Sequence, residues 1–227
     1  MTALFRPTSL DHVALWVSDR APLASFLCNH LGMHVIEESD TFTLVGVDAK
    51  LGKLTLFDAE GPREPGALER VMLRVRDIEN VIGPLPVEIE RDADGVLFDA
   101  SEGLRLGLVE ADGVDFDLHH VVLRLPDPAG AAQELAAMGF ERRDGRVAVA
   151  DRHVRLVQGE PDDLGRPLLN HIALLVDSAR DVQHRAAAHG FEIDDVKDAP
   201  NTFAVFLRGP AGIRIEYLEH KPGFALV

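Results

Sequence analysis

A short sequence segment is repeated four times along the chain, and one position in it is the starting point for the possible chemistry. In each repeated segment apolar residues alternate with polar or small ones. The residue just before the apolar stripe is His12, Arg70, His120 or His171. The intervals between them are 58, 50 and 51 residues. Imidazole is a ligand that suits several divalent metals.

A carboxylate near the end of the chain has a matching placement. On its strand the apolar stripe is Ile213, Ile215 and Tyr217, so Glu216 lies on the opposite face, as His171 does on its own strand. A charged group inside a sheet is costly unless it is paired or bound to a metal. Two imidazoles and one carboxylate on one face leave open positions on a metal, which suits non-haem Fe(II).

Each repeated segment is the first strand of a module that continues with one helix and further strands. After the first repeated segment, the apolar residues within 19–31 have helical spacing, and three short β-like runs follow. The second module starts at Leu68, and its helix is cut short by Pro84 and Pro86. The pattern predicts an α+β protein of four βαβββ modules.

The order of the modules suggests how they pair. A helix followed by Gly-Phe recurs in the third and fourth modules, which favours pairing of those two. The polar stretch 111–115 is the best candidate for a boundary. We therefore expect an N-terminal domain at 1–113 and a C-terminal domain at 114–227.

Composition excludes several classes of partner. The net charge of −15 argues against nucleic acid and against an anionic membrane surface, since both need a basic face. Cys28 is the only cysteine, and no apolar run approaches the length of a membrane helix, so a cytoplasmic location is expected. Exposed sheet edges also leave room for a homo-oligomer.

Four such modules in series resemble the vicinal oxygen chelate superfamily, which includes glyoxalase I, bleomycin resistance proteins and extradiol dioxygenases. The resemblance covers about residues 10–218 and is strongest to the two-domain type I extradiol ring-cleaving enzymes. It implies that the modules are paired into two cupped mixed-sheet domains. It implies a metal held by His120, His171 and Glu216 in the C-terminal domain, with Fe(II) expected and Zn, Mn or Ni as alternatives. It also implies a small aromatic substrate, O2 as co-substrate and a role in aromatic catabolism.

The N-terminal half serves as an internal control. Its positions matching Glu216 are aligned as Leu56 and Gly107, so it offers no carboxylate. We therefore expect no metal there, and we interpret His12 as a structural polar residue.

Some polar residues that these dioxygenases usually have around the metal ligands are missing from this sequence. A Tyr is usual ten residues before the Glu ligand, and here that position is Phe206. For acid–base chemistry the nearest candidates are His153 and Arg155. The substrate pocket is expected to include Val122, Ala173, Phe206 and Arg214.

These departures leave three functions open. The first is extradiol ring cleavage of a catechol with O2. The second is a non-oxidative lyase or isomerase of the same superfamily, in which the metal polarises a carbonyl or stabilises an enediolate. The third is a ligand-binding or resistance protein without turnover.

Overall fold

The protein, seen in a computed structural model, is described over residues 3–143, 145–161 and 165–224. Within these ranges it has sixteen strands, four α-helices and two short 3-10 turns, η1 (Ser101–Gly103) and η2 (Pro210–Gly212). The strands form two eight-stranded mixed sheets. The predicted α+β fold of four βαβββ modules is confirmed.

The elements follow one another in the same order in every module. The first module contains β1 (Ser9–Val17), α1 (Arg20–His30), β2 (His34–Glu38), β3 (Phe42–Gly46) and β4 (Lys53–Asp58). The second contains β5 (Leu68–Val75), α2 (Ile78–Ile82), β6 (Glu90–Asp92), β7 (Gly95–Asp99) and β8 (Arg105–Glu110). The third contains β9 (Leu118–Leu125), α3 (Pro128–Ala137), β10 (Glu141–Arg143), β11 (Arg146–Val149) and β12 (Arg152–Gln158). The fourth contains β13 (Leu169–Leu175), α4 (Ala179–Ala188), β14 (Ile193–Asp198), β15 (Thr202–Arg208) and β16 (Arg214–His220).

The helices share one start signal. Each is preceded by a residue whose side chain accepts a backbone N–H of the first turn, and these N-caps are Asp19, Asp77, Asp127 and Ser178. The second helix has only five residues, because Gly83 and Pro84 follow it directly. The predicted short second helix is confirmed.

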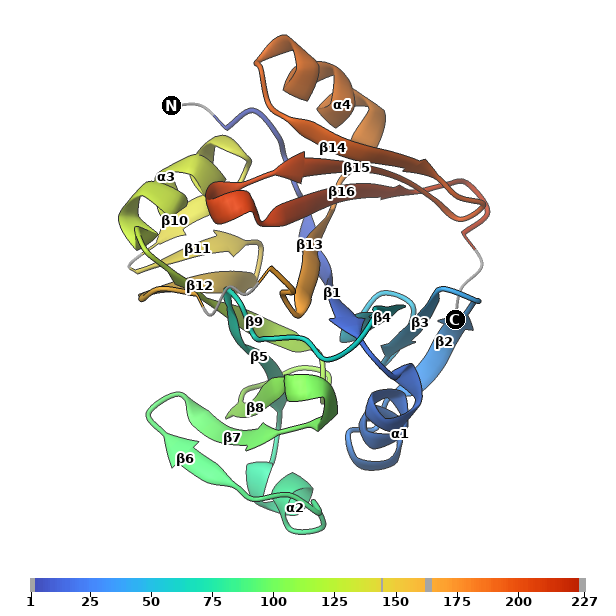
Figure 1. Cartoon of the computed structure of the whole chain (residues 1–227), viewed down its shortest axis with the longest axis vertical. Helices are drawn as coiled ribbons and strands as arrows, with labels where there is room; N and C mark the ends of the chain where they lie inside the picture. The colour runs from blue at the N-terminus through green and yellow to red at the C-terminus, as the bar shows by residue number, and fades with distance from the viewer. Residues whose placement is uncertain (1–2, 144, 162–164, 225–227) are drawn as a thin grey trace.

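The modules pair differently from the sequence-based expectation. One sheet has the order β14-β15-β16-β13-β1-β4-β3-β2, and the other has the order β10-β11-β12-β9-β5-β8-β7-β6. We call the first the terminal sheet, since it joins modules one and four, and the second the central sheet, since it joins modules two and three. In Figure 1 the blue and red-orange strands form the terminal sheet, and the green and yellow strands form the central one.

The expected division at 1–113 and 114–227 is therefore wrong as a description of how the modules pair. The stretch interpreted as a boundary is bound to β5 at its start and directly after its end: Ala111 N–H donates to Val75 O at 3.0 Å, and Phe116 N–H donates to Arg74 O at 2.7 Å. These bonds carry the chain directly from β8 to β9 within one sheet. Alternation could not reveal this, because it sets which face of a strand is buried and not which strand lies beside it.

The predicted inward stripe is confirmed. Ile172, Leu174 and Val176 lie in one apolar core that also holds residues from the central sheet and the helices. His171 and Ala173 are also buried, but they lie on the opposite face of β13, where Ala173 packs with Phe206 and Leu218. That face carries the candidate site.

A buried ion pair on the central sheet also forms hydrogen bonds to the terminal sheet. Arg152 of β12 donates to Asp117 at 2.8 Å and to the backbone oxygen of Leu10 at 2.6 Å. Asp117 also accepts the N–H of Gly52, which lies just before β4. The contact ties the central sheet to β1 and β4, the strands that border the site.

No helix among the described residues is long and apolar enough to cross a membrane.

Candidate metal centre

Three ligand-type atoms converge on one face of the terminal sheet. His12 Nε2 lies 3.1 Å from His171 Nε2 and 3.3 Å from Glu216 Oε2, and His171 Nε2 lies 2.9 Å from the same oxygen. His171 and Glu216 are buried, and His12 is nearly so. Among the described residues this is the one group of three or more histidine, cysteine or acidic side chains with metal-site spacing.

Strand register explains why these residues meet. In the antiparallel pair of β1 with β13, His12 lies opposite Ala173 and His171 lies opposite Ala14. The two histidines are thus diagonal neighbours on one face. In the parallel pair of β13 with β16, Glu216 lies beside Ala173. The small side chains of Ala14 and Ala173 leave room for the three larger groups.

Each imidazole is held by the residue before it. His171 Nδ1 lies 2.9 Å from Asn170 Oδ1, which also accepts from Arg214 at 2.9 Å. Arg214 can only donate, so the atom facing it is the amide oxygen, and His171 Nδ1 must be the donor. This tautomer leaves a lone pair on His171 Nε2, which faces Glu216.

The other histidine has an equivalent support. His12 Nδ1 lies 2.9 Å from Asp11 Oδ2, which is paired with Lys53 Nζ at 2.7 Å. Metal-bound histidines in proteins almost always donate their second ring nitrogen in this way, which fixes the ring and raises its basicity.

The electrostatics of the three groups are coupled. Burial lowers the pKa of His12, but the hydrogen bond to Asp11 and the contact with Glu216 raise it to about 9. Burial raises the pKa of Glu216, but the charge of His171 and its contacts with both histidines bring it well below the usual range. Burial lowers the pKa of His171. The metal-free site therefore holds a proton on His12 that a dication would replace.

The residues fit a divalent metal. Ligands at adjacent positions on one ion, with bonds of about 2.1 Å, lie about 3.0 Å apart, which is close to the spacing seen here. Glu216 Oε2 is buried and receives no hydrogen bond of acceptable geometry. Two histidines and one carboxylate on one side of a metal leave its remaining positions open.

The position related to Glu216 in the first module is Thr55. Thr55 lies beside Ala14 on β4 as Glu216 lies beside Ala173 on β16. The alignment that placed Leu56 there was off by one residue, because it relied on apolar spacing without the register of β1 and β4. Thr55 supplies no carboxylate, so the site has three strong ligands.

A cavity of about 630 Å³ opens over the three ligands. Its wall includes five aromatic side chains, which are Trp16, Phe42, Phe57, Phe206 and Phe224. The ring of Phe206 lies edge-on to His171, with centroids 5.1 Å apart. Lys53, Lys197 and Arg214 add cationic groups to the same wall.

The structure brings together only part of the predicted site. His171, Glu216, Ala173, Phe206 and Arg214 all lie on the cavity side of the terminal sheet, and all but Ala173 line the cavity itself.

Four predicted residues lie in the central sheet instead. They are His120 and Val122 of β9, and His153 and Arg155 of β12. The prediction that His120 joins His171 and Glu216 is wrong, since β9 pairs with β5 and not with β13. His153 and Arg155 are excluded as acid–base groups of this site, and Val122 as part of its wall, for the same reason.

His12 is the ligand-type residue that sequence reasoning set aside. Its signal was present, because a hydrogen-bond acceptor precedes the histidine in both Asp11-His12 and Asn170-His171. His220 was also missed; it lines the cavity, and its Nε2 is buried without a hydrogen-bond partner.

Comparison with known proteins places this architecture in a family. Residues 9–217 match the model of the Glyoxalase/Bleomycin resistance protein/Dioxygenase superfamily. The chain belongs to this superfamily. No curated protein matches it in sequence.

Solved structures share the superfamily fold at low identity. A candidate dioxygenase from Bacillus subtilis has 20% identity and a TM-score of 0.76, covering 97% of this chain and 88% of that one. Glyoxalase I from Zea mays has 14% identity and a TM-score of 0.66, with coverage of 94% and 92%. The cppA protein from Streptococcus pneumoniae has 16% identity and a TM-score of 0.65, with coverage of 94% and 98%. At these identities the likeness concerns the fold.

Proposed function

We propose that the protein is an Fe(II)-dependent extradiol-type dioxygenase, which opens the ring of a catecholic substrate with O2. The observation that carries the proposal is the set of His12, His171 and Glu216 on one side of an aromatic-walled cavity. This ligand set with open positions is typical of non-haem Fe(II) oxygenases. Iron held there would supply the redox chemistry that joins O2 to a chelated diol.

The cavity wall suits a flat aromatic substrate. Phe57 and Phe206 both lie against the ring of His171, at centroid distances of 6.1 and 5.1 Å. A ring placed between them gains edge and stacking contacts, while its oxygens face the ligand set. Lys197 and Arg214 of the same wall can neutralise a catecholate or a carboxylate substituent.

His220 is the residue proposed to move the substrate proton. It lies four residues after Glu216 on β16, so it faces the same side of the sheet. Its ring stacks on Phe224 at 3.9 Å. Burial lowers its pKa, which keeps a neutral imidazole available as a base near pH 7.

Ring cleavage places both atoms of O2 in the product, so no external reductant is required. Protein loaded anaerobically with Fe(II) should therefore consume O2 in a one-to-one ratio with a cleavable catechol. An oxygen electrode with a panel of substituted catechols measures this. His220→Gln should retain iron but lose most of the turnover. Absence of uptake across the panel in iron-loaded wild-type protein would refute the oxygenase.

A second function is favoured by one observation. Phe206 lies opposite Glu216 on the neighbouring strand β15 and has no hydroxyl to donate to a bound substrate oxygen. A non-oxidative lyase or isomerase, in which the metal polarises a carbonyl, does not need that donor. Turnover of an α-hydroxycarbonyl or thiohemiacetal substrate under nitrogen, with Zn, Mn or Ni in the site, would support this alternative over the oxygenase.

A further inference from the structure

The central sheet has a cavity at the place that corresponds to the metal centre. Arg70 lies opposite Val122 and Met72 lies opposite His120, just as His12 lies opposite Ala173 and Ala14 lies opposite His171. Arg155 lies beside Val122 as Glu216 lies beside Ala173. The three ligand positions are thus occupied by Arg70, His120 and Arg155, and the carboxylate of the metal centre is replaced by a guanidinium.

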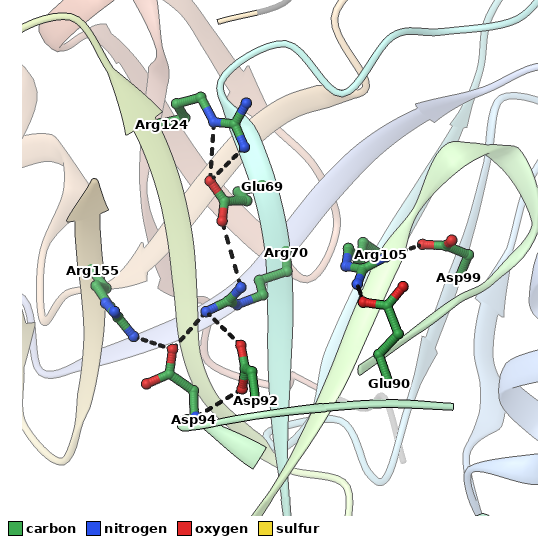
Figure 2. A network of polar contacts seen from close by, with 9 residues as sticks. All are labelled: Glu69, Arg70, Glu90, Asp92, Asp94, Asp99, Arg105, Arg124 and Arg155. Carbon is green, nitrogen blue, oxygen red and sulfur yellow. Dashed lines mark hydrogen bonds and ion pairs between the residues drawn. The ribbon is translucent and has the colours of Figure 1, made fainter. Parts of the chain in front are cut away.

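This exchange means that the site favours a negatively charged ligand instead of a positively charged one. Two guanidiniums repel a divalent metal but attract an anion, to which a neutral imidazole can donate a hydrogen bond. One carboxylate already lies between the guanidiniums: Asp94 Oδ2 is 2.6 Å from Arg70 Nη2 and also binds Arg155 Nη1 (Figure 2). Asp94 reaches in from the turn between β6 and β7. A carboxylate of the chain itself therefore marks where an anion fits.

Arg70 has carboxylate partners besides Asp94. Its guanidinium also lies 3.5 Å from Glu69 and 3.6 Å from Asp92, as Figure 2 shows. Arg155 has no other carboxylate partner in the part of the chain that the structure describes. If Asp94 moves aside, Arg70 remains compensated and Arg155 is free to bind a ligand.

The space next to Arg155 is open and carries further donors. A cavity of about 450 Å³ is lined by Asp94, Arg146, Arg155 and the three histidines His119, His120 and His153. Within the described residues, Arg146 has no carboxylate partner. His120 is only 5% exposed, and its Nε2 has no hydrogen-bond partner.

Of the three charged side chains that line this cavity, two are cationic, Arg146 and Arg155, and one is anionic, Asp94. Burial, then the charges of Arg146, His119, Arg155 and Arg143, lower the pKa of His153 to about 4. Burial and the neighbouring histidines lower the pKa of His120 to about 3, with Asp94 opposing and Arg70 adding to the shift. Near pH 7 both rings are neutral, and each can donate one N–H to an incoming oxygen. This positive pocket stands out in a chain whose net charge is −15.

We propose that the central cavity binds a small oxyanion between Arg155 and Arg146, with Asp94 holding Arg155 while the ligand is absent. The ligand class is a carboxylate or a phosphate. Both offer oxygens that a guanidinium binds in pairs, and both can accept a hydrogen bond from His120. The site is separate from the metal centre, because it lies on the other sheet.

The test titrates the full chain with malonate and, separately, with inorganic phosphate, using calorimetry at low ionic strength. One equivalent should bind. Asp94→Asn should bind about tenfold more tightly, because the competing carboxylate is removed. Arg155→Gln should bind about tenfold more weakly or worse, because a charged hydrogen bond is lost. Arg155 is partly exposed, so this variant is expected to fold.

A matched control lies on the same sheet. Arg105 of β8 is paired with Glu90 and Asp99, apart from the contacts of Asp94 in Figure 2. It is not among the residues that line the cavity. Arg105→Gln should bind either anion as the wild type does. Glu216→Gln should do so as well, since the anion does not bind at the metal centre.

The location of binding is checked by NMR of the histidine rings. Malonate or phosphate should shift the ring signals of His120 and His153 in wild-type protein and not in Arg155→Gln. Binding of one anion and not the other would identify the ligand as a carboxylate or a phosphate. The proposal is overturned if neither anion binds to wild type or to Asp94→Asn, or if binding does not respond to Arg155→Gln.

Discussion

Asp11 and Asn170 perform the same task with different chemistry. Each accepts the Nδ1 proton of the histidine that follows it, and each is in turn held by a cation, Lys53 or Arg214. Asp11 is charged. Burial raises the pKa of its carboxyl group, but the contacts with Lys53 and His12 outweigh that effect and lower the pKa to about 2. Asn170 is neutral, so His171 stays uncharged more readily than His12. The two ligands are therefore not equivalent in basicity.

This difference predicts the effect of removing one support. Asn170→Ala should weaken metal binding by about 10- to 100-fold, because the ring of His171 loses the acceptor that fixes its tautomer. Asn170→Asp is the matched control, since it retains an acceptor at the same place and should keep most of the affinity. Competition with a chelating dye measures both. An unchanged affinity in Asn170→Ala would show that the amide does not orient the ligand.

At the residue level, the family resemblance predicted His171 and Glu216 as metal ligands, and the alternation of apolar residues supported that prediction. Alternation placed both on the face opposite the core, and the structure has them 2.9 Å apart. It was not enough to choose between His12 and His120, since both occupy the same position in the repeat. One local difference was available: His12 follows an acidic residue, whereas His120 follows another histidine.

At the scale of elements, the order of strands and helices could be predicted, but the pairing of modules could not. Apolar stripes and helix caps are local signals, so they specify each module. Pairing depends on which first strands hydrogen-bond, and the two possible arrangements bury the same stripes.

The observed pairing predicts how fragments behave. Residues 114–227 contain β13 and β16 but not β1, so this fragment alone lacks His12 and leaves one side of β13 unpaired. We expect it to bind no metal, and an equimolar mixture with 1–113 to recover binding. Size-exclusion chromatography with metal analysis of each sample provides the measurement. A soluble 114–227 fragment that holds a full equivalent of metal would contradict the pairing.

At the scale of the whole molecule, the two sheets share one core, and a buried ion pair on the central sheet forms hydrogen bonds to the terminal sheet. Arg152 and Asp117 are each about 5% exposed, and their contact joins the central sheet to β1 and β4. The metal centre on the terminal sheet thus has its first strand anchored from the other sheet.

Breaking this link should destabilise the whole fold. Arg152→Met removes the close cation of buried Asp117 and leaves only the 3.9 Å contact with Arg74. Removing one partner of a buried ion pair typically costs about 3–5 kcal/mol. Arg143→Met is the control, since the pair of Arg143 with Glu141 is exposed and should contribute little. Urea unfolding, followed by circular dichroism, compares the two. Equal stability of both variants would mean that the link between the sheets is not important for folding.

The most direct test of the account is the metal content of four proteins after loading with Fe(II) and removal of excess metal. They are the wild type, His12→Ala, His120→Ala and Glu216→Gln. The account predicts about one metal per chain in the wild type and in His120→Ala, and almost none in His12→Ala and Glu216→Gln. Metal that is retained in His12→Ala but lost in His120→Ala would contradict it.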